Sequence, residues 1–276
     1  MRLQRQPNGS FGTGSLKVDG TEQRVNKSEE VWRQLATVVD PELDESVTDM
    51  KFISRVDVDA SDCVHIDFRL PTYWCAANFA FLMADDMRTA LRTLPWVKDT
   101  NIVLGEHMYA DKINHGVANG LSFQATFGDE ADGNLDDVRR TFLVKAFQRR
   151  QEALIKHLMS NEASAEDIST LTMGELETHS AAANGEGQKL IVRYKERRAV
   201  VGPYSHETLA FVTTGGQPLE PGSLPGYMLA LRRVRANAEF NGALCRGLLE
   251  ARFDTTTPLV KKNGHVCHPR PVAVES

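Results

Sequence analysis

Two segments of the sequence carry side chains suited to metal chemistry. The first is a carboxylate-rich turn over residues 40–53, which contains Asp40-Pro41-Glu42 and Asp49. The second is residues 70–76, where Cys75 stands between a predicted strand and a predicted helix. Unpaired backbone N–H groups and the positive end of the helix dipole stabilise a thiolate at such a junction. We therefore expect Cys75 to be suited to metal or sulfur ligation.

Each segment also has a simpler interpretation. A carboxylate-rich turn between a helix and a strand is ordinarily a solvated loop. A cysteine beside a strand is often a small apolar residue packed in the core. Taken one at a time, the two segments leave these alternatives open.

Histidines and a cysteine near the C-terminus form a second candidate metal site. His265, Cys267 and His268 lie close together, and Cys245 is available from the preceding predicted helix. Imidazole and thiolate suit zinc or iron, but this spacing matches none of the strong structural zinc patterns. The alternative is a proline-rich tail in which these side chains are merely solvated.

A further group has side chains that could ligate a metal but lies in a predicted loop. Its members are Glu106, His107 and His115. Gly116 and Gly120 follow closely, and they predict a loop. We therefore expect these histidines to be ordinary loop residues and not metal ligands.

The elements around Cys75 are predicted from hydrophobic periodicity. Residues 64–70 alternate apolar and polar side chains, which is typical of a strand with one buried face. Weaker strand patterns cover 52–58 and 97–104, and helical stripes cover 28–40 and 79–94. The order helix, strand, strand, helix, strand predicts a small two-layer α/β (α+β) domain.

The predicted domain organisation has four parts. Residues 1–27 are rich in Gly, Ser, Asn and charge, and they predict a flexible leader. The α/β domain follows over residues 28–120, and a helical extension covers 121–180. A smaller mixed α/β domain with an extended tail is predicted over 188–276.

The mixed character of the last domain depends on two short apolar runs. Residues 190–194 and 208–213 predict strands, and a helical stripe follows over 227–253.

The long helix predicted after Asn134 carries a basic stripe. Its members are Arg139, Arg140, Arg149 and Arg150. Such a stripe is ordinarily a solvated face, and docking of a partner protein is the alternative.

Composition disfavours several classes of function. The 276 residues include 32 Lys and Arg against 37 Asp and Glu, so the net charge is −5 and binding to nucleic acid or anionic lipid is not expected. No hydrophobic run could span a bilayer, and no apolar run follows the basic N-terminus. The 4 cysteines are widely scattered, which does not resemble a disulfide framework. We expect reduced thiols and a cytoplasmic location.

The two motifs together resemble those of the iron-sulfur cluster assembly family, which includes SufT-type factors and PaaD-type accessory proteins. In that family an Asp-Pro-Glu turn precedes a hydrophobic-Asp-hydrophobic segment, matched here by Asp40-Pro41-Glu42 and Val47-Thr48-Asp49-Met50. A strand then leads into a cysteine-containing loop that opens a helix, matched here by residues 70–75. The chain departs from the family pattern at Tyr73-Trp74 and Ala76, which replace prolines, and at Lys51, which replaces a glycine.

The resemblance covers about residues 31–106 and implies the assembly or delivery of iron or iron-sulfur centres. It implies that Cys75 is the reactive or metal-ligating residue, with Asp49 as a neighbouring polar member of the site. Clusters are commonly held by four cysteine ligands, so a site with one thiolate implies a shared or transient iron or iron-sulfur centre.

The extension after residue 121 is similar in size and place to that of longer accessory proteins of soluble diiron monooxygenases of the propane or acetone type. We therefore predict a non-catalytic maturation factor whose partner is a client metalloenzyme, such as the hydroxylase of a diiron monooxygenase. One alternative is a regulatory or scaffolding subunit of an oxygenase complex, in which Cys75 is only packed. An enzyme with its site in the C-terminal half is a weaker alternative, and self-association stays open.

Overall fold

The first domain is built on a three-stranded sheet, and its central strand is the one with the clearest pattern in the sequence. This strand, β2 (Cys63–Arg69), pairs antiparallel with β1 (Ile53–Val58) and parallel with β3 (Asp99–Gly105). The computed structural model describes residues 20–131, 134–182 and 185–253. The predicted strand positions are confirmed to within two residues.

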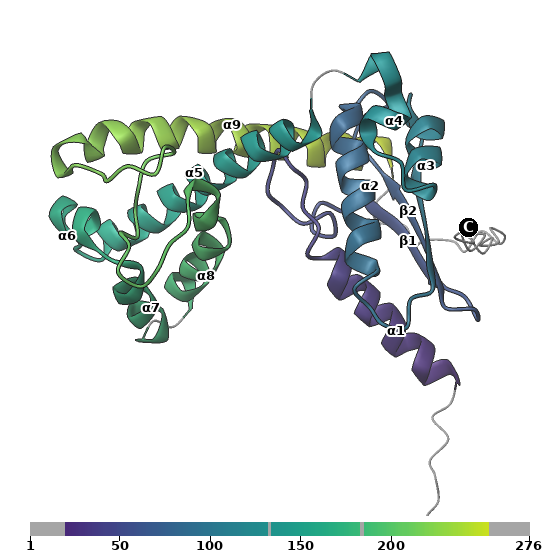
Figure 1. Cartoon of the computed structure of the whole chain (residues 1–276), viewed down its shortest axis with the longest axis horizontal. Coiled ribbons are helices and arrows are strands. Elements are labelled where there is room, and N and C mark those ends of the chain that lie inside the picture. Colours follow the sequence, from purple (N-terminus) through teal and green to yellow (C-terminus); the bar gives the residue numbers. More distant parts are fainter. Residues whose placement is uncertain (1–19, 132–133, 183–184, 254–276) are drawn as a thin grey trace, which may run out of the picture.

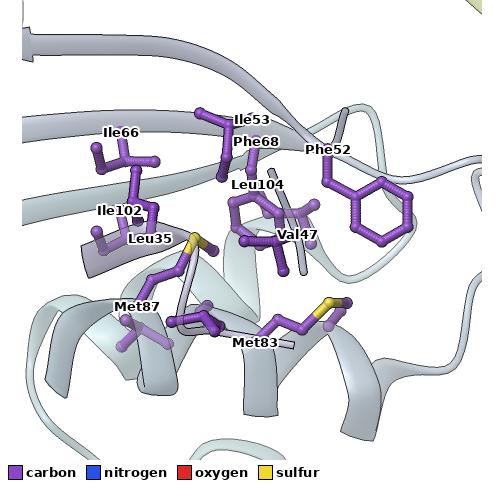
Figure 2. Packing of buried hydrophobic residues seen from close by; sticks show 14 of the residues in the cluster. Leu35, Val47, Phe52, Ile53, Ile66, Phe68, Met83, Met87, Ile102 and Leu104 are labelled. Atoms are coloured by element: carbon purple, nitrogen blue, oxygen red, sulfur yellow. The ribbon is translucent and has the colours of Figure 1, made fainter. Parts of the chain in front are cut away.

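Two helices cover one face of this sheet. α1 (Gly20–Leu35) and α2 (Ala77–Leu91) present apolar stripes to the strands, and they bury them in a single core (Figure 1). Figure 2 shows side chains of this core, labelled Leu35, Val47, Phe52, Ile53, Ile66, Phe68, Met83, Met87, Ile102 and Leu104. The predicted two-layer α-β-β-α-β arrangement is therefore present.

The first helix begins earlier than predicted. α1 starts at Gly20, whereas its start was expected at Ser28, so the last residues assigned to a flexible leader are helical. Lys27 is held by contacts distant in sequence, because its Nζ lies 2.6 Å from Asp62 Oδ1 and 5.0 Å from the centre of the Trp96 ring. Such tertiary contacts have no local sequence signal.

The prediction of a loop after β3 is wrong. Residues there form α3 (Ala110–Ala118) and α4 (Phe123–Phe127), followed by a 3₁₀ turn, η1 (Gly128–Glu130). Gly116 lies within α3, and a Cβ at this position would come within 2.2 Å of Thr126 Oγ1. The glycine therefore permits close packing of α3 on α4, and it does not break the helix.

The second domain is helical. Its elements are α5 (Leu135–Ser160), α6 (Ala165–Thr170), α7 (Met173–Ala182), α8 (Glu186–Arg198), η2 (Ala199–Val201), η3 (Pro221–Ser223) and α9 (Leu224–Arg252). Asn134 caps α5 and Ser164 caps α6, as their residue types predict. The mixed α and β class of the whole chain is confirmed, with a small sheet in the first domain and helices after it.

The strand predicted at 190–194 is wrong, because these residues lie inside α8. Ile191 and Tyr194 are three residues apart and are buried together, which is helical spacing. Tyr194 donates a hydrogen bond from its hydroxyl to the carbonyl oxygen of Ala210. Within the described chain, residues 208–213 make only isolated bridges to Thr172 and Pro218, so the strand predicted there is not formed.

The basic stripe of α5 contacts the first domain. Arg139 forms two hydrogen bonds with Asp86, both 2.8 Å long, and Arg150 bonds both carboxylate oxygens of Asp44, at 2.6 and 2.9 Å. The expected solvated face is therefore wrong at these two arginines. Arg140 is exposed, in line with the prediction.

Two long helices connect the domains (Figure 1). α9 contributes Leu224 to the core of the second domain and Leu249 to the core of the first. It is continuous through Asn241-Gly242, where an interruption was considered. None of the helices in the described parts of the chain is long and apolar enough to cross a membrane.

Candidate functional site

Cys75 lies where the sequence predicts it, between the central strand and the next helix. β2 ends at Arg69, and Ala76 is the N-cap residue of α2. The Cys75 side chain is half-buried, and its Sγ lies 3.1 Å from Thr72 Oγ1 in a hydrogen bond. The sulfur is therefore partly accessible and has a polar neighbour.

His107 holds the loop that carries Cys75. Its Nε2 donates a 2.8 Å hydrogen bond to the Cys75 carbonyl oxygen, and its Nδ1 accepts one of 3.2 Å from the Tyr109 amide. Burial lowers the pKa of His107, the bond to Cys75 partly opposes this, and nearby Arg252 lowers the pKa further. His107 lies in the loop between β3 and α3, as predicted, and its two hydrogen bonds hold the backbone on either side of the site.

The Asp40-Pro41-Glu42 turn is partly buried. The Asp40 side chain accepts a 2.8 Å hydrogen bond from the Leu43 amide, and the residue is only 8% exposed. Burial is the main cause that raises the pKa of Asp40 to about 6, and the charge of Glu42 raises it further. The interpretation of this turn as a fully solvated loop is therefore wrong at Asp40.

Asp49 is exposed and faces a different region. It lines a cavity of about 910 Å³ between the domains, together with Arg149 and Arg193. Cys75 is not among the residues that line this cavity. Joint ligation of a metal by Cys75 and Asp49 stays a prediction.

The C-terminal end of α9 contacts both motif segments. Asn241 donates a 2.9 Å hydrogen bond to Glu42 Oε1, and Arg252 donates one of 3.3 Å to the Leu70 carbonyl oxygen. Cys245 lies between these two contact points on the helix, and it packs on the same core as Cys75. Burial raises the pKa of Cys245 to about 11, and the charges of Asp40, Cys75 and Glu42 contribute to the rise.

The surface beside Cys75 is apolar and aromatic. Tyr73 is 52% exposed and Trp74 is 72% exposed. Met108 is also exposed, and its amide donates a 2.9 Å hydrogen bond to the Tyr73 carbonyl oxygen. Exposed apolar patches are typical of protein interaction sites.

A different set of side chains brings three ligand types together. Atoms of Asp59, Cys63 and His65 lie within 4.8 Å of one another, on the hairpin between β1 and β2. Cys63 is disulfide-bonded, so its sulfur is not a thiolate, and the expectation of reduced cysteines is wrong at this position. Asp59 instead accepts hydrogen bonds from the Ser61 and Cys63 amides, which is a structural role in the turn.

Two contributions to the site are not predicted from the sequence. His107 acts through the Cys75 backbone, and Cys245 approaches from a helix far along the chain. The helical spacing of Cys245 with Asn241 and Leu249 is a usable signal, because it places the three on one face. The predicted second metal site at His265, Cys267 and His268 lies outside the described residues.

Comparison with known proteins gives one family match and one similar protein. Residues 28–104 match a family model described as iron-sulfur cluster assembly protein. The Fe-S protein maturation auxiliary factor YitW of Bacillus subtilis (strain 168) is 34% identical over 74 residues, which cover 27% of this chain and 71% of that protein. No solved structure matches the chain.

Proposed function

Because this chain belongs to the iron-sulfur cluster assembly protein family, we propose that it is a maturation factor that helps to assemble iron or iron-sulfur centres in another protein. The observation that carries the proposal is the half-buried thiol of Cys75, held between a strand end and a helix start. A similar auxiliary role is named for the Bacillus subtilis relative. In this role the chain acts through binding and transfer and does not itself catalyse a reaction.

The iron or iron-sulfur centre is the cargo of the proposed factor. Cys75 would bind it through sulfur, and Asp49 would be a candidate oxygen ligand once the cargo or the client approaches. A single thiolate does not complete a stable cluster site, so the centre would be held transiently. Transient holding suits a protein that must release what it binds.

The client would contact the surface beside Cys75. Tyr73 and Trp74 expose large aromatic side chains next to the thiol, and aromatic residues are enriched at protein interfaces. A solvated loop with no partner has no physical reason to expose them together. Their position supports transfer of the cargo directly across the interface.

We also propose that the client is a multicomponent diiron monooxygenase and that transfer takes place in the cytoplasm. The support is the helical extension, which lies beyond the family match at 28–104 and docks on the first domain through α5 and α9. A carboxylate-bridged diiron centre lies inside a helical bundle, so a helper with a large second domain could hold the open apo-form during metal entry.

The test compares client maturation with the wild-type chain, Cys75→Ser and Ala76→Ser, each co-expressed with the client under anaerobic conditions. Ala76 is the exposed neighbour of Cys75, so its serine variant controls for a new hydroxyl in the same loop. We expect Cys75→Ser to lower the iron content of the client several-fold, and Ala76→Ser to leave it unchanged.

Equal iron loading with all three chains would overturn the metal role of Cys75. The alternative of a scaffolding subunit gives a different result in the same preparation. It requires this chain to co-purify with the mature client at fixed stoichiometry, whereas a maturation factor is absent from the finished enzyme.

A further inference from the structure

We propose that the outer face of α9 is a docking surface for a second copy of this chain, so that two chains pair through antiparallel α9 helices. The inference goes beyond the proposed function, because it concerns a surface that does not include Cys75. The helix lies outside the residues that match the family model, which end at residue 104. The dimer would therefore be specific to the longer chain.

The outer face of α9 is apolar, whereas a surface helix ordinarily carries polar side chains on this side. Its inner face contacts the first domain through Asn241 and Leu249. On the opposite side, exposed apolar and small residues recur at spacings of three and four, which places them on one stripe of the helix. This outer stripe consists of Phe240, Ala243, Leu244, Gly247, Leu248 and Ala251.

The large members of the outer stripe are open to solvent. Phe240 is 68% exposed, Leu244 is 50% exposed and Leu248 is 39% exposed. Single exposed apolar residues are common on protein surfaces, but a contiguous row of them, one helical turn apart, is typical of an interaction site. We therefore expect a partner to cover the outer stripe.

Gly247 indicates that the backbone of the partner approaches closely. A glycine inside a helix weakens the helix, so it usually has a packing reason. Gly116 has such a reason within the chain, because a Cβ there would lie 2.2 Å from Thr126 Oγ1. A Cβ on Gly247 would meet no packed neighbour within 4 Å among the described residues. The space beside Gly247 is therefore available to atoms from another chain.

The charges beside the outer stripe favour a second copy as the partner. One edge of the stripe carries, in order, Arg235, Glu239, Arg246 and Glu250. Two antiparallel α9 helices centred near residue 242 place Glu239 beside Arg246 of the second copy. The same register places Arg235 beside Glu250 of the second copy, whereas a parallel pair would bring like charges together. Opposite charges at the edge of a helix pair fix both the partner and its orientation.

Glu239 and Arg246 are accessible for this contact. The Glu239 side chain is 62% exposed beside Arg235, and the Arg246 side chain is 46% exposed beside Glu45. A carboxylate accepts several hydrogen bonds and a guanidinium donates several. The ion pairs within one chain therefore hold both side chains in place and leave capacity for the second copy.

The same register matches large side chains to small ones. Phe240 lies opposite Ala243 of the second copy, and Gly247 lies opposite Ala236 of the second copy. Large residues that face small ones let two helices approach and interdigitate. A single helix face is smaller than the roughly 800 Å² per partner of a standard interface, so we expect a reversible dimer with a micromolar dissociation constant.

Sedimentation velocity of the purified full chain, from micromolar to submillimolar concentration, measures this association. We expect the wild type to shift from monomer to dimer across the range. Phe240→Ser should raise the dimer dissociation constant at least about tenfold, because it removes a central aromatic anchor. Val192→Ser is the matched control, because Val192 is an exposed apolar residue of α8, and it should associate as the wild type does.

Charge-reversal variants test whether the partner is a second copy. Glu239→Arg alone and Arg246→Glu alone each bring like charges together in the pair, so we expect each to dimerise far more weakly than the wild type. An equal mixture of the two variants restores opposite charges between the Glu239 and Arg246 positions. We therefore expect the mixture to form a heterodimer, a recovery that no other occupant of this surface predicts.

Three results would overturn the pairing. The first is a wild-type chain that stays monomeric throughout the range, and the second is a dimer that persists in Phe240→Ser and in both charge variants. The third is a monomeric wild type whose co-purification with the client is weakened by Phe240→Ser, since the outer stripe would then be a client surface. Circular dichroism identifies any variant that has lost its fold, and Leu244→Ser then replaces Phe240→Ser as the probe.

Discussion

At the scale of single residues, the candidate site depends on polar groups that hold loops through backbone atoms. His107 bonds the Cys75 carbonyl oxygen, and Asp40 accepts from the Leu43 amide. Neither contact places its side chain on the cargo, but each fixes a segment that carries a candidate ligand. Lys51 also has an unusual backbone conformation. Its φ of 57° lies in the left-handed region, as expected at a position where the family has a glycine.

The buried carboxyl of Asp40 predicts a pH dependence of stability. Its pKa is about 6 in the folded chain against the ordinary value of 3.8 for an aspartate, so the folded state binds more protons between these values. The free energy of unfolding therefore falls as the pH rises through this window, and the cost is complete above about pH 6. Asp40→Asn keeps an acceptor for the Leu43 amide and removes the cost. We expect it to be more stable than the wild type by about 2 kcal/mol at pH 8.

Urea unfolding at pH 8 and pH 4.5 measures this difference. The gap should shrink at pH 4.5, because the wild-type carboxyl is then largely protonated in the folded state. Asp57→Asn, at an exposed position, is the control and should change little at either pH. A gap of the same size at both pH values would contradict the assignment of the cost to ionised Asp40.

At the scale of elements, the sequence predicts those whose pattern is local and misses those fixed by tertiary contacts. The alternation over 64–70 and the cysteine at the following junction are sufficient to predict β2 and the place of Cys75. The pattern at 190–194 is too short to distinguish a strand from the buried face of a helix. Gly116 predicts a helix break from the sequence alone, because its close packing against Thr126 is visible only in the folded structure. The helical spacing of Cys245 with Asn241 and Leu249 places them on one face, but no local pattern indicates that this face meets the first domain.

The basic stripe of α5 shows how one helix joins the domains, and it predicts unequal effects for two arginines of this helix. The side chains of Arg150 and Asp44 are 7% and 5% exposed, and they form a buried ion pair. Removing Arg150 leaves the buried Asp44 carboxylate with one ion-pair partner, Arg197, in place of two. We expect Arg150→Ala to lower the free energy of unfolding by about 2 kcal/mol, the scale of losing hydrogen bonds to a charged group.

Arg140→Ala on the same helix is the comparison, because Arg140 is exposed. Its effect should lie within about 0.5 kcal/mol of zero. Chemical denaturation of the two variants measures both values. Similar losses for both would mean that helix propensity, and not the buried pair, decides the effect.

At the scale of the whole molecule, two continuous helices couple two hydrophobic cores. α9 has 29 residues, so it extends about 43 Å at 1.5 Å per residue, and it contributes to the core at each end. α5 runs beside it and pairs with the first domain through Arg139 (Figure 1). Neither core is complete without these helices. We therefore expect the wild-type chain to unfold in a single cooperative transition.

A proline in the middle of α9 should break this coupling. Ala236 is exposed and lies between the two ends of the helix, so Ala236→Pro removes a backbone hydrogen bond without emptying either core. A proline inside a helix costs about 3 kcal/mol. We expect differential scanning calorimetry to resolve two transitions in place of one, with the domain around Cys75 losing the support of Leu249.

Ala236→Ser separates the break from the substitution itself, because serine keeps the backbone N–H and should retain the single transition. Ala236→Pro also bears on the site, since α9 beyond the proline would no longer hold Cys245 against the first domain. One unshifted transition in Ala236→Pro would show that the domains fold as a unit without a continuous α9. The coupling would then have to come from α5 and its ion pairs, and Arg150→Ala in the proline background would split the transition.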